Sequence, residues 1–182
     1  MIASIIFILG TAFFVWFSWR SLRNPHSHGF YRFIAWECML ALVIINFPMW
    51  TIDPFTPRQI ISWSLLLVSI FLAVHAFRLL RAIGQPGSAR NEPELLPFER
   101  TSTLVTTGAY RYIRHPMYAA LLYLAWGAFL KDISLPSVGL IIGSSVALYF
   151  TARCDEEECK RHFGENYTEY MTRTKRFVPF VF

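Results

Sequence analysis

"GAYRYIRHPMYAALLYL", residues 108–124, sets a cluster of basic side chains directly against an apolar run. Arg111, Arg114 and His115 come just before Pro116, and most residues after Pro116 are apolar. Proline suits the first turn of a helix, where its missing N–H costs nothing, so a helix is predicted to begin at Pro116. The N–H groups and dipole of that helix end favour an anion beside Arg114 and His115. In the simpler alternative, Arg111 and Arg114 only contact anionic lipid headgroups.

The rest of the chain is also rich in apolar blocks. Its 182 residues are 54% hydrophobic and 17% aromatic. Blocks of nearly 20 apolar residues can cross the roughly 30 Å hydrocarbon core as helices, which satisfy their own backbone hydrogen bonds. We therefore predict an all-α integral membrane protein that forms a single domain, residues 1–182. Its five predicted transmembrane helices cover residues 2–19, 30–50, 60–77, 116–130 and 137–152, and a cytoplasmic C-terminal helical segment follows them.

The distribution of basic residues predicts the orientation. With five spans, all 17 Lys and Arg residues except Arg58 and Lys131 fall on one side of the membrane. The positive-inside rule then places the C-terminus in the cytoplasm and the N-terminus on the opposite side. Residues 1–19 are interpreted as a retained span, because they lack the basic start and small-residue cleavage pattern of a signal peptide. The "RYIRHP" segment and the C-terminal tail then share the cytoplasmic face.

A run of four acidic residues follows the last predicted span, within "RCDEEECKRHFGENYTEY", residues 153–170. A helix through this segment would place Arg153 beside Glu157, and Glu156 beside Lys160, at i,i+4 spacing. Such pairs are commonly solvated surface ion pairs. Four consecutive acids just below a negatively charged leaflet are nevertheless electrostatically unfavourable, and a bound cation would explain them.

A second, shorter helix is predicted after this acidic helix. Gly164 is placed to end the first helix, and "ENYTEYM" resumes helical character. Tyr167 and Tyr170 are three residues apart in it, and we interpret them as packing anchors at the membrane interface.

The histidines and cysteines do not have the spacing of a metal site. His26 and His28 lie in a polar loop, and no H-E-x-x-H occurs. The three cysteines contain no C-x-x-C pair, which also argues against a disulfide framework. We predict no metal.

Two separated segments resemble one known family. Residues 103–118, "TLVTTGAYRYIRHPMY", resemble the G-x-Y-x-x-x-R-H-P-x-Y signature of the isoprenylcysteine carboxyl methyltransferase family, which is related to membrane phospholipid methyltransferases. Residues 153–170 resemble that family's acidic helix followed by F-G-x-x-Y-x-x-Y. The resemblance implies S-adenosylmethionine as methyl donor, bound in residues 100–182 between the last two spans and the C-terminal helix.

The resemblance also implies which residues form the site. Two cofactor-binding segments follow from it, namely Thr103, Leu104, Val105 and Tyr110, and His115, Pro116, Met117 and Tyr118. Arg153 matches an arginine taken to contact the substrate and the transferring methyl group, so it is the predicted catalytic residue. The acidic cofactor residue depends on the point from which the motif is counted. We take Glu156 and Glu157 for this role, with Asp155 as the alternative.

The implied function is methyl transfer to a lipophilic or prenylated acceptor that enters from the bilayer, most like protein-S-isoprenylcysteine carboxyl O-methyltransferase. An alternative is a phospholipid amine N-methyltransferase, which needs a base; Glu37, in the second span, is a candidate if that span packs against the site. In a third reading, a non-catalytic scaffold or transporter subunit, Arg114 and Arg153 only contact headgroups. Membrane lipids are expected partners, nucleic acid is not, and no oligomeric state is predicted.

Overall fold

The computed structural model describes residues 1–85, 87, 95–96 and 99–181 of the chain. Within these residues the secondary structure is helical, apart from one isolated bridge between Ile113 and Lys175. The α-helices are α1 (Ile2–Ser18), α2 (His28–Asn46), α3 (Pro57–Ala82), α4 (Pro116–Phe129), α5 (Leu135–Phe163) and α6 (Glu165–Arg173). Three short 3₁₀ helices accompany them, η1 (Ser21–Arg23), η2 (Phe47–Met49) and η3 (Gly108–Arg111). The predicted all-α class is confirmed for the described residues.

The helix starts follow from capping residues and prolines. Ser27, Thr56 and Ser134 each accept a hydrogen bond from a backbone N–H in the first turn of α2, α3 and α5. Helix α4 begins at Pro116, as the sequence predicts. Gly164 separates α5 from α6 with φ +60°, a conformation that residues with a side chain rarely adopt. The acidic residues 155–158 therefore belong to the C-terminal part of one long helix, α5.

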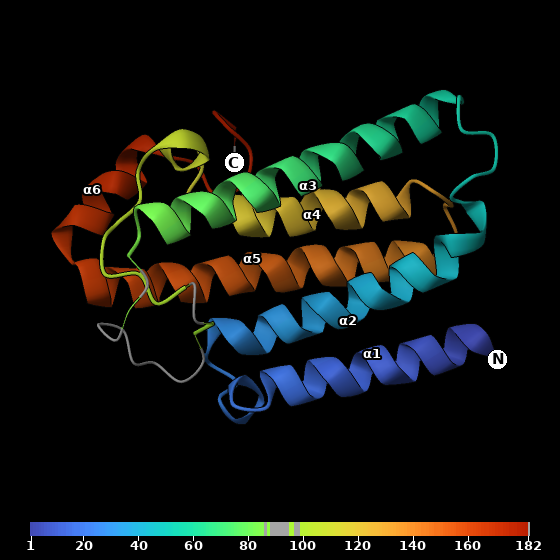
Figure 1. Cartoon of the computed structure of the whole chain (residues 1–182), viewed down its shortest axis with the longest axis horizontal. Helices are drawn as coiled ribbons and strands as arrows, with labels where there is room; N and C mark the ends of the chain where they lie inside the picture. The colour runs from blue at the N-terminus through green and yellow to red at the C-terminus, as the bar shows by residue number, and fades with distance from the viewer. Residues whose placement is uncertain (86, 88–94, 97–98, 182) are drawn as a thin grey trace.

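Helices α1 to α5 lie side by side along the long axis of the molecule, and α6 lies at one end of them (Figure 1). In this bundle α2 packs along α5 and α3 packs along α4, while α1 packs on α2 at the edge. The N-terminus lies at the end of the bundle opposite α6 (Figure 1). The start of α4 and the ends of α3 and α5 therefore meet near α6.

Three helical segments are long and apolar enough to cross a membrane: His28–Met49, Pro57–Ala82 and Leu135–Phe163. The apolar helices α1 and α4 are shorter, with 17 and 14 residues. At 1.5 Å per residue they reach about 26 and 21 Å, less than the hydrocarbon thickness. Large apolar side chains on the outer faces of α1 and α3 are exposed, which suits contact with lipid.

Small residues let α4 sit close to its neighbours. A Cβ at Gly127 would lie 2.8 Å from Leu66 of α3. Ser62 and Ser69 of α3 donate hydrogen bonds of 2.7 Å to the carbonyls of Gly127 and Ala120. Close backbone approach and interhelical serine bonds are typical of membrane helix packing, and here they fix α4 against α3.

Candidate functional site

A cavity of about 90 Å³ lies among α4, α5, α6 and the segment before α4; we call it the α6 cavity. Its walls combine aromatic, acidic and basic side chains. They are Leu80, Glu99, Thr101, Leu104, Val105, Tyr110, Arg114, His115, Met117, Tyr118, Asp155, Cys159, Phe163, Tyr167 and Tyr170. The segments that carry the two sequence motifs thus meet at one place.

Most of the predicted cofactor residues meet in this cavity. Those that line it are Leu104, Val105, Tyr110, His115, Met117 and Tyr118. The predicted residues that are not among its lining are Thr103, Pro116, Arg153, Glu156 and Glu157. Arg153 and Glu157 are exposed on α5, and Glu157 pairs with Lys160 at 2.8 Å. Asp155, the alternative acid, lies in the cavity wall.

The residues after α6, from Lys175 on, form the C-terminal tail, and this tail holds α6 over the cavity. The backbone N–H of Arg114 donates to the carbonyl of Lys175 at 2.7 Å, and the N–H of Lys175 donates to the carbonyl of Tyr112 at 3.0 Å. The hydroxyl of Tyr170 on α6 donates to the carbonyl of Tyr110 at 2.5 Å. Tyr167 and Tyr170 are buried as a result, so these two tyrosines form cavity wall in addition to packing.

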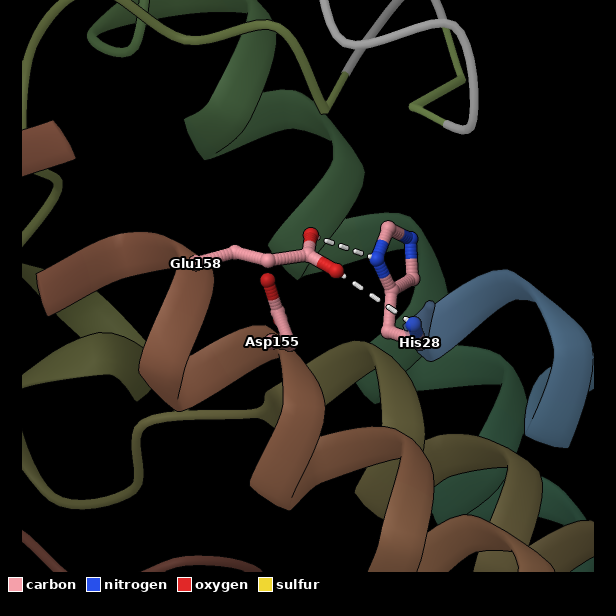
Figure 2. A group of neighbouring side chains, drawn as sticks. All are labelled: His28, Asp155 and Glu158. Carbon is pink, nitrogen blue, oxygen red and sulfur yellow. Dashed lines mark hydrogen bonds and ion pairs between the residues drawn. The ribbon is translucent and has the colours of Figure 1, made fainter. Parts of the chain in front are cut away.

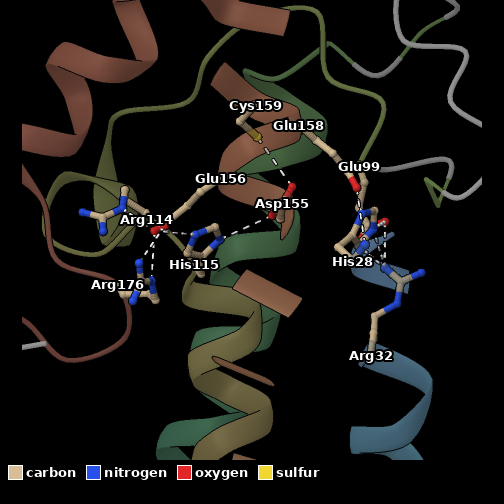
Figure 3. Close-up of polar contacts among 10 residues, drawn as sticks. All are labelled: His28, Arg32, Glu99, Arg114, His115, Asp155, Glu156, Glu158, Cys159 and Arg176. Atoms are coloured by element: carbon tan, nitrogen blue, oxygen red, sulfur yellow. Dashed lines mark hydrogen bonds and ion pairs between the residues drawn. The ribbon is translucent and has the colours of Figure 1, made fainter. Parts of the chain in front are cut away.

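Glu156 is the centre of a buried ion network (Figure 3). Arg114 Nε lies 2.9 Å from its Oε1, and Arg176 contacts both carboxylate oxygens at 3.0 and 2.7 Å. His115 Nε2 lies 3.4 Å from Oε1. Two guanidinium groups already neutralise this carboxylate, and the network joins α5, the segment before α4 and the C-terminal tail. Glu156 therefore has a structural role here.

His115 lies between Glu156 and Asp155, its Nδ1 3.4 Å from Asp155 Oδ2 (Figure 3). Burial lowers the pKa of this imidazole, but hydrogen bonds to the two carboxylates outweigh it and raise the pKa above the ordinary value. The two carboxylates therefore favour the protonated form of this imidazole, which lies at the start of α4. Asp155 also accepts a weak hydrogen bond from the Cys159 thiol at 3.5 Å.

A second polar group lies across the bundle, where α2 begins. His28 is completely buried, and its Nδ1 lies 2.7 Å from Glu158 Oε2 on α5 (Figure 2). Its Nε2 lies 3.6 Å from Glu99 Oε2. His28, Asp155 and Glu158 offer ligand atoms within 4.8 Å of one another. Because both ring nitrogens of His28 face carboxylates, we interpret the group as an ion pair of an imidazolium, which is not a metal ligand.

Glu99 and Arg32 of α2 extend this group of polar contacts (Figure 3). Arg32 donates from one guanidinium nitrogen to both Glu99 oxygens, at 2.6 and 2.8 Å. Burial raises the pKa of the Glu99 carboxyl, but Arg32 and His28 outweigh it and lower the pKa to about 2. Sequence reasoning missed His28, Arg32 and Glu99, because they are far apart along the chain and belong to none of the motifs.

Three of the four acids in the run on α5 thus contact basic side chains from other segments. Arg114 and Arg176 pair with Glu156, His28 pairs with Glu158, and His115 contacts Asp155. A bound cation is not needed to explain these acids.

A larger cavity of about 360 Å³, which we call the apolar groove, lies beside the α6 cavity. Its lining is mainly apolar: Arg32, Trp36, Ser69, Ile70, Ala73, Val74, Leu96, Glu99, Met117, Tyr118, Ala120, Leu121 and Leu124. Glu99, Met117 and Tyr118 line both cavities. Ile70 and Val74 are exposed on the outer face of α3, so the groove extends from the α6 cavity to the lipid-facing surface.

Glu37 does not belong to either cavity. It accepts a hydrogen bond from the Thr11 hydroxyl at 2.8 Å and so joins α2 to α1. The second predicted span, α2, does pack near the site, but its residues that line the apolar groove are Arg32 and Trp36.

Comparison with known proteins agrees with this arrangement. A sequence profile of the phospholipid methyltransferase family matches residues 57–169, from the start of α3 into α6. The chain belongs to this family. With its three long apolar helices, family membership indicates an integral membrane protein. The predicted relation to the isoprenylcysteine carboxyl methyltransferases and membrane phospholipid methyltransferases is confirmed.

Individual relatives are similar in sequence to part of this chain. Human protein-S-isoprenylcysteine O-methyltransferase is 36% identical over 83 residues, which are 44% of this chain and 29% of the human protein. The Mus musculus protein of the same name is 35% identical over the same shares. Arabidopsis thaliana protein-S-isoprenylcysteine O-methyltransferase B is 34% identical over 86 residues, 46% of this chain and 43% of that protein. The matches thus span less than half of these relatives. No solved structure matches the chain.

Proposed function

We propose that the protein is a membrane-embedded, S-adenosylmethionine-dependent methyltransferase that acts on a lipophilic acceptor. One observation carries the proposal. A cavity with aromatic, acidic and basic walls meets an apolar groove at Glu99, Met117 and Tyr118, and the groove reaches the lipid-facing surface. A polar methyl donor and an apolar acceptor can therefore approach one another from opposite sides.

The side chains of the α6 cavity fit the chemistry of the donor. Its carboxylate suits His115, Arg114 and the start of α4. Its amino group suits Asp155, which we take as the acidic cofactor residue in preference to Glu156 and Glu157. Its adenine suits an aromatic wall, which the cavity offers in Tyr110, Phe163, Tyr167 and Tyr170. When bound, this cofactor supplies a methyl group on a sulfonium sulfur that leaves as a neutral thioether.

The protein's own task is positioning and exclusion of water. Met117 and Tyr118 stand in the first turn of α4 between the two cavities, so they border the place where acceptor and donor meet. The tyrosines of α6 cover this place from the other side. A dry site favours reaction of an anionic acceptor, because the two reacting charges disappear in the transfer. Holding the acceptor in line with the methyl group is the remaining requirement.

The acceptor we propose first is a prenylcysteine-type carboxylate, which is methylated on oxygen and has no proton to lose. The named activity of the human and plant relatives supports it. A phospholipid amine is the alternative that the family profile supports. Arg153 remains the catalytic residue predicted from the motif, although it is exposed on α5. For it to act, its side chain would have to reach the acceptor from that position.

We also propose the predicted topology of five spans, with the α6 cavity on the cytoplasmic side. Arg114, Arg153 and Arg176 belong to the segment before α4, to the C-terminal half of α5 and to the tail after α6. The N-terminus lies at the end of the bundle opposite α6 (Figure 1). The positive-inside rule supports a cytoplasmic location for the α6 end. The short helices α1 and α4 would then span with help from local thinning of the bilayer or flanking polar residues.

The proposed function is tested by donor binding and by product formation. Purified protein in detergent is titrated with S-adenosylhomocysteine, and membranes that contain the protein are incubated with S-adenosylmethionine labelled on the methyl group. The proposal predicts saturable binding at one site and label in a lipid product. Absence of both from folded protein would favour the alternative of a non-catalytic membrane scaffold or transporter subunit.

A further inference from the structure

The apolar groove contains one cation among its described lining residues, Arg32. This side chain is 3% exposed and belongs to the second turn of α2. Its guanidinium is held by Glu99 at 2.6 and 2.8 Å and lies 5.1 Å from the ring of Trp36. The pair Arg32 and Glu99 therefore forms the polar inner end of an otherwise apolar groove.

Glu99 uses only part of the hydrogen-bonding capacity of Arg32. Both bonds to Glu99 leave from the same terminal nitrogen. The Nε–H of Arg32 is buried and has no hydrogen-bond partner among the described residues. Buried donors are nearly always paired in folded proteins, so an unpaired one in a cavity wall indicates a bound group that accepts a hydrogen bond.

The unpaired donor at this place favours an anionic headgroup over an amine. An ammonium group cannot accept the Nε–H of Arg32, and an amine would need a base to take its proton before methylation. Glu99 is a poor base because Arg32 and His28 hold its pKa near 2. Asp155, the other carboxylate in the α6 cavity wall, is already engaged by the His115 ring, whose Nδ1 lies 3.4 Å from its Oδ2. A carboxylate acceptor needs no base and complements a guanidinium.

We propose that Arg32 binds the carboxylate headgroup of the acceptor. The apolar tail of the acceptor lies along α3 and α4 in the groove, and its head reaches the inner end beside Met117 and Tyr118. There it adjoins the α6 cavity. This inference rests on the proposed function and its carboxylate acceptor, and it names the residue that selects that acceptor.

Binding of a matched pair of probes tests the inference without turnover. The probes are an S-farnesylated N-acetylcysteine with a free carboxylate and its neutral carboxamide, applied to purified protein in detergent. Wild-type protein is expected to bind the carboxylate about tenfold or more tightly, because a hydrogen bond to a charged group is worth that much. In Arg32→Gln the preference should disappear. Arg32→Lys, which keeps the charge but loses the planar fork, should retain part of it.

Glu99→Gln is the matched control, because it breaks the same ion pair and leaves Arg32 in place. If Arg32 binds the carboxylate, this variant keeps the preference or increases it. Equal loss in Arg32→Gln and Glu99→Gln would show a purely structural role for the pair and overturn the inference. So would an undiminished preference in Arg32→Gln, or no preference in wild-type protein.

Two further readouts separate this inference from the proposed function. S-adenosylhomocysteine affinity should stay within about twofold of wild type in Arg32→Gln, because Arg32 does not line the α6 cavity. Failure of wild-type protein to bind S-adenosylhomocysteine would end the proposed function, while the probe experiment would still decide the role of Arg32. A methylated amine as the product would contradict the inference and leave methyl transfer to a lipophilic acceptor standing.

Discussion

Arg176, in the C-terminal tail, contacts both carboxylate oxygens of Glu156 on α5, at 3.0 and 2.7 Å. Arg114 contacts the same carboxylate from the segment before α4. Arg114 also donates to the carbonyls of Met171 and Thr174, just before the tail. These contacts between α5, the segment before α4 and the tail therefore hold α6 and its tyrosines over the α6 cavity.

Glu156→Gln is predicted to loosen this closure. Removing one partner from a buried ion network leaves Arg114 and Arg176 without a counter-charge, which costs about 3 kcal/mol or more. The thermal midpoint in detergent should fall, and amide exchange of α6 should rise before that of the membrane helices. Glu157→Gln is the control, since this exposed residue should contribute within about 0.5 kcal/mol. Equal effects of the two substitutions would contradict a structural role of Glu156.

Asp155→Asn and Glu157→Gln test which acid binds the donor. Asp155 lines the α6 cavity and Glu157 faces away from it. S-adenosylhomocysteine affinity, measured by calorimetry, should fall about tenfold or more in Asp155→Asn, because a charge-assisted hydrogen bond is lost. It should be unchanged in Glu157→Gln. The reverse result would support the assignment made from the motif.

Tyr170→Phe removes the hydroxyl that bonds to the carbonyl of Tyr110 and keeps the ring. The loss of one buried hydrogen bond is expected to cost about 1 kcal/mol, since the carbonyl is left without that donor. Donor affinity should weaken severalfold because α6 closes less firmly. Tyr112→Phe, at a half-exposed ring, is the control and should bind donor as wild type does. Unaltered affinity in Tyr170→Phe would argue that α6 is held by its ion network alone.

Acidification is predicted to remove the contribution of Glu99. The folded pKa of this carboxyl, about 2, lies below its ordinary value of 4.5. Its contribution to stability is therefore complete above pH 4.5 and is lost as pH falls toward 2. Thermal midpoints of wild type and Glu99→Gln, measured across this range, should converge on acidification. A constant difference between them would contradict the lowered pKa.

Ala73→Phe is predicted to block the apolar groove while the donor still binds. Ala73 is on α3 and lines the groove, but it does not line the α6 cavity. A phenyl ring there should lower kcat/KM for a farnesylated acceptor by about tenfold or more, since it takes space from the acceptor tail. S-adenosylhomocysteine affinity should be unchanged. Loss of donor binding would instead show a general packing defect.

The sequence predicts the parts of this site that depend on local order along the chain. Helix α4 begins at Pro116, as the sequence predicts. Six residues that the motif resemblance assigns to cofactor binding lie together in the wall of the α6 cavity. The choice between Asp155 and Glu156 depends on helical phase. Asp155, Cys159 and Phe163 recur every fourth residue and so share the face of α5 that lines the cavity. Counting back from Phe163 at this spacing selects Asp155, which the structure places in the cavity wall.

Sequence patterns do not predict contacts between segments that are far apart along the chain. Glu156 pairs with Arg176 in the tail, and Glu158 pairs with His28 at the start of α2. No sequence motif contains both partners of either pair. Arg32 and Glu99 are in contact although they are 67 residues apart in the chain. Charge runs read alone indicate solvated pairs or a bound cation, and only the packing of the bundle reveals the buried partners.

The central claim is that donor and acceptor meet where the α6 cavity joins the apolar groove. The most direct measurement incubates membranes containing wild-type protein or Ala73→Phe with methyl-labelled S-adenosylmethionine and a farnesylated carboxylate, and follows label in the organic phase. We predict a base-labile methyl ester with wild-type protein and about tenfold less with Ala73→Phe, at equal S-adenosylhomocysteine affinity. Equal label with both proteins, or none with folded wild-type protein that binds the donor homologue, would contradict the claim.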